Sequence, residues 1–70
     1  MSRLKNGATE YARVESLSGI WVAAEIDHGS AGHRFATWRM DPEGNTFWGH
    51  YFDTRDEASR DLLARAVRVV

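Results

Sequence analysis

The feature that most constrains the fold of this chain is a single amphipathic segment at its C-terminal end, residues 54–70. Thr54 and Glu57 have the spacing of a capping box, in which a hydroxyl and a carboxylate satisfy free amides of the first helical turn. Apolar residues then recur at helical spacing, with charged residues between them. The apolar stripe consists of Ala58, Leu62, Leu63, Ala66, Val67 and Val70. This pattern predicts one helix, which needs an apolar surface to cover.

Four short stretches before the helix have the alternation, or the aromatic and β-branched content, that is typical of strands. They span residues 9–16, 20–27, 33–40 and 46–52. Turn-forming residues separate them, most clearly in 41–45, where Gly44 or Asn45 is expected to adopt a positive φ. Because short connections favour pairing of successive strands, we predict an α+β fold: a four-stranded antiparallel meander with one C-terminal helix packed on one face.

The chain is predicted to form one small domain. Residues 1–8 are polar and predict a flexible N-terminal segment, followed by a single ββββα domain over 9–70. The 70 residues include no cysteine, which excludes disulfides and thiolate metal sites. The first residues lack an apolar run, and no stretch approaches the ~20 apolar residues of a membrane span. We therefore expect a cytoplasmic protein that does not contact a membrane.

A single helix covers one face of such a sheet, so the pattern also predicts which side chains remain uncovered. The expected floor beneath the helix consists of Val14, Ile20, Val22, Ala24 and Ile26. Trp21 alternates with this set and is expected on the opposite, uncovered face.

The last two predicted strands carry most of the aromatic residues. In the last strand, Phe47 and Tyr51 are expected on one face, and Trp48, His50 and Phe52 on the other. In the third strand two registers stay open, which bury either Phe35 and Thr37 or Ala36, Trp38 and Met40. Whichever register holds, large rings are left on the face that the helix does not cover.

Exposed aromatic surfaces on small proteins usually mark contact sites, and tryptophan is the residue that most often anchors an interface. We therefore predict a non-enzymatic protein-binding domain with Trp21 and Trp48 as anchors. Trp38, His50 and Arg39 are predicted neighbours of these anchors. A homodimer through the same surface would bury the same rings. The alternative is that the rings pack on one another and on the 28–32 loop as part of the core.

Nucleic-acid binding is the alternative function. Arg13, Arg34 and Arg39 would line one side of the sheet between tryptophans, an arrangement that suits stacked single-stranded bases. Nine basic and ten acidic residues give a net charge of −1, so no global positive field supports this alternative.

No catalytic residue, metal site or cofactor is predicted. His28, His33 and His50 lie near aspartates but lack the ligand spacing of a zinc site. Ser30 is the nearest approach to a nucleophile, in a glycine-rich loop. A domain of this size is also expected to have little room for a pocket of several hundred cubic ångströms.

Two resemblances to known families bear on these expectations. The segments 21–26 (WVAAEI) and 49–66 (GHYFDTRDEASRDLLARA) resemble parts of the AP2-type DNA-binding domain, with its strand meander and its alanine-rich helix after paired acids. That resemblance implies a similar architecture, while the dense arginines of the family's first strands are missing here. By size and style, the chain also resembles small phage-encoded inhibitors such as anti-CRISPR proteins, which implies binding to a target surface.

Overall fold

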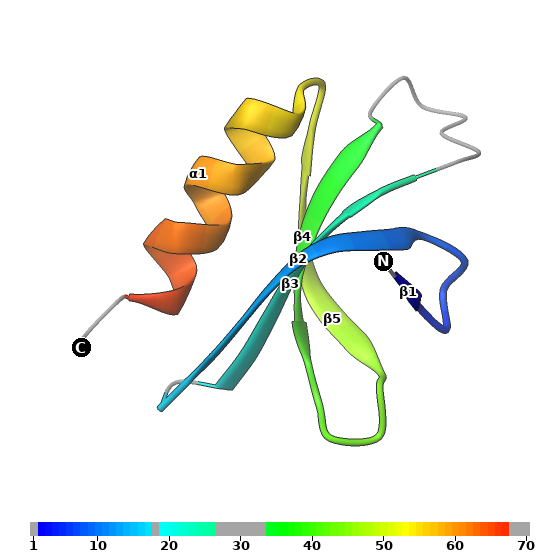
Figure 1. The fold of residues 1–70 in the computed structure, drawn as a ribbon, viewed down its shortest axis with the longest axis vertical. Coiled ribbons are helices and arrows are strands. Elements are labelled where there is room, and N and C mark those ends of the chain that lie inside the picture. The colour runs from blue at the N-terminus through cyan, green and yellow to red at the C-terminus, as the bar shows by residue number, and fades with distance from the viewer. Residues whose placement is uncertain (1, 18, 27–33, 68–70) are drawn as a thin grey trace.

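The computed structural model describes residues 2–17, 19–26 and 34–67, and it confirms the α+β fold. The strands pair antiparallel in the order β1-β2-β3-β4-β5, and α1 lies along one side of the sheet (Figure 1). The elements are β1 (Ser2–Arg3), β2 (Thr9–Ser16), β3 (Gly19–Glu25), β4 (Phe35–Met40), β5 (Thr46–Phe52) and α1 (Arg55–Ala66). The four long strands form the predicted meander, and β1 adds a short fifth strand. The predicted loop 28–32 lies outside the described residues.

Thr54 is confirmed as the helix cap and the β4–β5 turn is confirmed, but the Glu57 carboxylate binds the Thr54 hydroxyl and not a backbone amide as the capping box predicts. The Thr54 hydroxyl accepts from the Glu57 amide at 3.2 Å and donates to the Glu57 carboxylate at 2.9 Å. Gly44 has a φ of +92°, as the turn requires. The Asp41 carboxylate accepts from the Asn45 side chain and backbone at 3.0 and 2.8 Å, and these hydrogen bonds lower the pKa of Asp41.

The helix covers the opposite face of the sheet from the one predicted. Its buried residues Ala58, Leu62 and Ala66 are mostly small, so α1 approaches closely over a floor that contains one large ring, Trp21, beside Ala23. Val14 is the one member of the predicted floor that lies here, because it pairs directly with Trp21 across β2 and β3. Small residues on the helix therefore match a large residue on the sheet.

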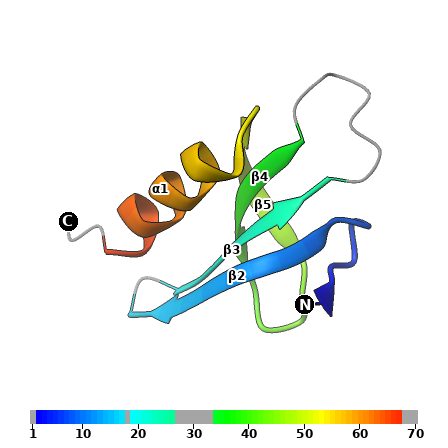
Figure 2. The same ribbon diagram turned by 45° about the horizontal axis from the view of Figure 1, so that its top comes forward.

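The other face carries a second core, which the N-terminal segment closes. Leu4 and Ala8 are buried there, in a cluster that also holds Val22, Ala24, Ala36, Trp38 and Met40. In the views of Figures 1 and 2, β1 and the turn after it lie on the side of the sheet away from α1. The segment predicted to be flexible thus covers the aliphatic face that was assigned to the helix. Of the two registers predicted for β4, the structure shows the one that places Ala36, Trp38 and Met40 in this cluster.

A β-bulge in β5 overturns the predicted alternation of its aromatic residues. The pairing with β4 shifts register between Thr37 and Arg39, and Trp48 has a φ of +57°. Beyond the bulge His50 pairs with Thr37, and before it Phe47 pairs with Arg39, so both lie on the helix side. Tyr51 lies on the opposite side from Phe47, because the extra residue reverses the alternation.

The two adjacent leucines of α1 give a matched test of which face is buried. Leu62 is 3% exposed against Trp21, whereas Leu63 is 58% exposed. Leu62→Ala should lower the free energy of unfolding by about 2–5 kcal/mol, because it leaves a cavity over Trp21. Leu63→Ala should change it by less than about 0.5 kcal/mol. Urea denaturation of both variants measures the difference, and equal effects would contradict the assigned orientation of the helix.

Candidate functional site

The three tryptophans, all predicted to contribute to a contact surface, have different environments. Trp21 is 8% exposed beneath α1, and Trp38 is 7% exposed in the second core. The assignment of Trp21 as an anchor and Trp38 as its neighbour is therefore wrong, because this sheet has a packed core on each face. Trp48 is 64% exposed and is the one predicted anchor that can meet a partner.

Arg65, near the end of α1, reaches into the seam between the helix and the sheet. One of its terminal nitrogens donates to the Thr37 hydroxyl at 3.1 Å, and the other donates to the Trp48 carbonyl at 2.6 Å. The guanidinium carbon lies 4.8 Å from the centre of the Trp21 ring. Burial lowers the pKa of Arg65, while the nearby Asp61 carboxylate opposes that shift. The helix, β4 and the bulge of β5 thus share one guanidinium.

Asp61 completes this cluster from the preceding turn of α1. Its carboxylate accepts from the Thr37 hydroxyl at 2.6 Å and lies 3.0 Å from His50 Nδ1. The Thr37 side chain is fully buried, and its hydroxyl both donates to Asp61 and accepts from Arg65. The hydroxyl is inaccessible to a substrate, so the role we assign to this cluster is to join helix and sheet. His50, predicted as a neighbour of the anchors, belongs to it.

The backbone of Trp48 adopts an unusual conformation, with a φ of +57°. A positive φ in a residue with a bulky side chain costs about 1–3 kcal/mol, and the hydrogen bond from Arg65 to its carbonyl helps to hold this conformation. The next residue is Gly49, where a Cβ atom would lie only 2.6 Å from the Trp38 indole nitrogen. Phe47 packs edge-on against Trp48 with ring centres 5.0 Å apart. The bulge therefore presents two adjacent rings.

Arg39 adds a positive charge beside these rings. Its guanidinium carbon lies 5.4 Å from the Trp21 ring centre and 6.0 Å from that of Trp48. Its Nε is buried without a hydrogen-bond partner, and no carboxylate of the described residues lies within ion-pair distance. Gly19 has a φ of +130°, which favours glycine, and a Cβ there would overlap this guanidinium unless the arginine side chain moved. Arg39, Phe47 and Trp48 together are called the Trp48 surface below.

The three arginines of the nucleic-acid alternative do not line one side of the sheet. Arg13 lies on the face away from the helix and makes two hydrogen bonds of 2.8 Å to Glu10. These bonds and the negative charge of Glu10 raise the pKa of Arg13 against the effect of burial. Arg34 pairs with Glu25 at 3.0 Å. Arg39 is the one member of the set whose charge is not matched by a described carboxylate.

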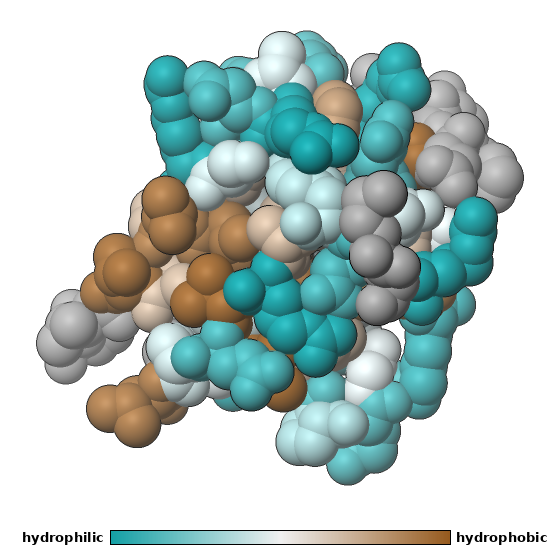
Figure 3. Space-filling view, in the orientation of Figure 1, coloured by the Kyte–Doolittle hydropathy of each residue, from teal (hydrophilic) through white to brown (hydrophobic). Residues whose placement is uncertain are grey.

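Exposed apolar side chains gather beside the helix, whereas the sequence predicted them on the face opposite it. Figure 3 shows an apolar area over the C-terminal half of α1 and the neighbouring β2–β3 turn. Leu17, Leu63 and Val67 are the large exposed apolar residues of these elements. Leu63 and Val67 were predicted to lie in the buried stripe of the helix. The buried stripe is therefore narrower than predicted and consists of Ala58, Leu62 and Ala66.

The remaining predictions concern metal binding, a nucleophile and membrane contact. Within 2–17, 19–26 and 34–67, no group of three histidines, aspartates or glutamates is placed to hold a metal ion. His28, Ser30 and His33 lie outside these ranges. In the described part of the chain, no helix combines the length and the apolar character needed to span a membrane.

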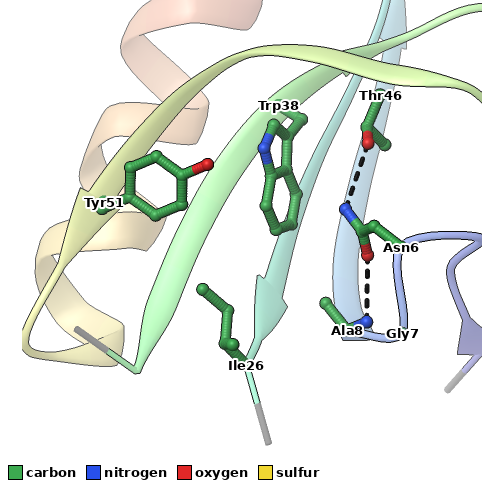
Figure 4. Close-up of a pocket in the computed structure, with 7 residues that line it drawn as sticks. All are labelled: Asn6, Gly7, Ala8, Ile26, Trp38, Thr46 and Tyr51. Carbon is green, nitrogen blue, oxygen red and sulfur yellow. Dashed lines mark hydrogen bonds between the residues drawn. The ribbon is translucent and has the colours of Figure 1, made fainter. Parts of the chain in front are cut away.

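The face away from the helix contains a cavity of about 420 Å³ that is open to solvent and bordered by Trp38 and Tyr51 (Figure 4). The expectation that so small a domain lacks room for such a pocket is therefore wrong. The N-terminal segment supplies one wall of this cavity through Asn6, Gly7 and Ala8, which the four predicted strands alone do not supply.

Replacement of Thr37 tests the cluster at the helix–sheet seam. Thr37→Val keeps the shape of the side chain but leaves Asp61 and Arg65 without its hydroxyl, so we expect a loss of about 2 kcal/mol in the free energy of unfolding. Thr37→Ser keeps the hydroxyl and should lose only about 1 kcal/mol through the missing methyl group. Thermal denaturation compares the two. A Thr37→Val protein as stable as the unmodified chain would show that these bonds contribute nothing.

Comparison of the chain with protein-family models, with curated proteins and with solved structures found no match in any of the three. The resemblances to the AP2-type domain and to small phage-encoded inhibitors therefore stay predictions. The function has to be inferred from the geometry of the site itself.

Proposed function

We propose that this protein is a non-enzymatic protein-binding domain and that the Trp48 surface is its contact site. The observation that carries the proposal is an exposed tryptophan in a backbone conformation that disfavours it. Glycine would occupy the same position without strain. A large ring at a strained, exposed position is typical of a functional site.

The energetics of the Trp48 surface suit an interface anchor. Trp48 and Phe47 offer adjacent apolar area, and tryptophan is among the residues that contribute most to binding free energy. The hydrogen bond from Arg65 to the Trp48 carbonyl holds the bulge before a partner arrives. A preformed anchor loses less conformational entropy on binding than a mobile one.

Arg39 indicates the chemistry of the partner. Its guanidinium is flanked by two indole rings and lacks a carboxylate partner among the described residues. A partner that places an aspartate or glutamate there, next to an apolar group over Trp48, would form charge-assisted hydrogen bonds in a site partly shielded from water. We therefore propose a partner whose contact segment is both acidic and apolar.

This partner chemistry favours a different protein over a second copy of this chain. In a two-fold symmetric dimer the same patch faces itself, so a pairing centred on the Trp48 surface would bring two Arg39 guanidinium groups together. Like charges at an interface oppose association. A small domain that occupies an acidic and apolar surface of another protein acts by blocking it, which agrees with the inhibitor that the resemblance implies.

Trp48→Gly tests the anchor without disturbing the fold, because glycine accepts a φ of +57° and the free energy of unfolding should change by less than about 1 kcal/mol. The partner would be captured from native extract with the unmodified domain and then purified. Calorimetry would give its Kd for each variant. We expect Trp48→Gly to weaken binding at least about 30-fold, the effect of losing an interface anchor.

Leu63→Ala is the control, because Leu63 is an exposed apolar residue that belongs neither to the Trp48 surface nor to the core. Its Kd should stay within about threefold of the unmodified value. A captured protein that binds Trp48→Gly as tightly as the unmodified domain would overturn the proposal. So would tight binding of a short single-stranded oligonucleotide that weakens steeply between low and high salt, since phosphate contacts behave in that way.

A further inference from the structure

The cavity on the face away from α1 is a second candidate site, separate from the Trp48 surface. Its apolar walls come from Trp38, Tyr51, Ile26 and Ala8, and its polar end comes from Asn6 and Thr46 (Figure 4). A volume of about 420 Å³ lies within the range of pockets that hold small organic molecules. The described lining carries no ionisable acid or base other than the phenol of Tyr51.

Two hydrogen-bonding groups meet at the aromatic side of this cavity. The rings of Trp38 and Tyr51 lie edge to face with centres 6.1 Å apart, and the Tyr51 hydroxyl points toward the indole (Figure 4). A Cβ atom at Gly49 would lie 2.6 Å from the indole nitrogen and 3.0 Å from that hydroxyl, so glycine lets both groups approach the same point. Neither group makes a hydrogen bond to any described residue. Both are therefore available to an incoming acceptor.

Two hydrogen bonds of Asn6 connect the residues at the opposite end of the cavity. The Asn6 side-chain amide donates to the Thr46 hydroxyl at 3.0 Å, and its carbonyl accepts from the Ala8 amide at 2.9 Å. Since the Thr46 oxygen already accepts from Asn6, its own hydrogen is free to donate. The cavity thus has hydrogen-bond donors at both ends and apolar walls between them.

We infer that this cavity binds a small, neutral aromatic compound that carries a carbonyl oxygen. Aromatic walls favour stacked or edge-on contact with a ring. The free donors require an acceptor, and a carbonyl oxygen supplies one. A charged ligand would lose hydration without an opposite charge in the described lining, which is unfavourable.

Benzamide, which combines a ring with a neutral carbonyl group, is the probe that tests this inference. The nitrogen–proton NMR spectrum of the labelled protein contains one indole signal for each of the three tryptophans, and a Trp38→Phe variant identifies that of Trp38. Titration with benzamide should shift the Trp38 signal saturably and leave the Trp48 signal in place. Benzoate and benzylammonium, the charged analogues, should bind at least about fivefold more weakly.

Two tyrosine variants complete the experiment. Tyr51→Phe removes only the hydroxyl of a half-exposed residue, and its Kd for benzamide should rise about fivefold. Tyr11→Phe is the control, because the Tyr11 hydroxyl contacts Ser59 and the Arg55 carbonyl of α1 on the other face. Its Kd should be unchanged. The inference fails if benzamide gives no saturable shift of the Trp38 signal, if the charged analogues bind equally well, or if Tyr51→Phe binds like the unmodified protein.

Discussion

The partly buried guanidinium of Arg65 is the interaction on which the rest of this structure depends. A charged group at the seam between a helix and a sheet is tolerated only if its donors are satisfied, because an unpaired buried charge is strongly destabilising. Thr37 of β4 and the Trp48 carbonyl of β5 accept its hydrogen bonds, and the Asp61 carboxylate of α1 lies 3.9 Å away as an ion-pair partner. Helix docking and the conformation of the β5 bulge are therefore held by the same group. The site that we propose for partner binding is a consequence of how the helix is attached.

The domain stabilises itself with two thin cores, one on each face of the sheet. Seventy residues bury only about 60% of their extended surface, so a sheet with one covered face would leave too much apolar area in water. Alanines on α1 let the helix approach Trp21 closely, and Leu4 and Ala8 of the N-terminal segment close the other face over Trp38. This arrangement buries two of the three tryptophans and leaves Trp48 exposed.

The regular part of the fold was predictable from the sequence, because alternation, turn residues and the Thr54 cap are local signals. The choice of face was not, because it depends on how closely a helix lined with alanine can approach Trp21. The bulge at Trp48 has no local signature other than the neighbouring Gly49. A prediction that does not include the bulge assigns the aromatic residues of β5 to the two faces of the sheet by simple alternation.

The candidate site was predictable only in part. Trp48 and Arg39 were identified by residue type and strand position, and both lie at the site. Arg65 was missed, because a basic residue in the last turn of a helix usually faces solvent and its charge suits the helix dipole. The cavity beside Trp38 was missed because one of its walls comes from a polar segment that lacks the pattern of a strand or helix.

The crystal structure of the Arg65→Met variant tests most directly whether this guanidinium holds the bulge. Methionine fills much of the same space beside Trp21 but cannot donate to the Trp48 carbonyl. We predict that Trp48 then leaves its φ of +57° and that β5 pairs with β4 without the bulge. A variant in which Trp48 keeps its positive φ, with α1 seated as before, would contradict the account.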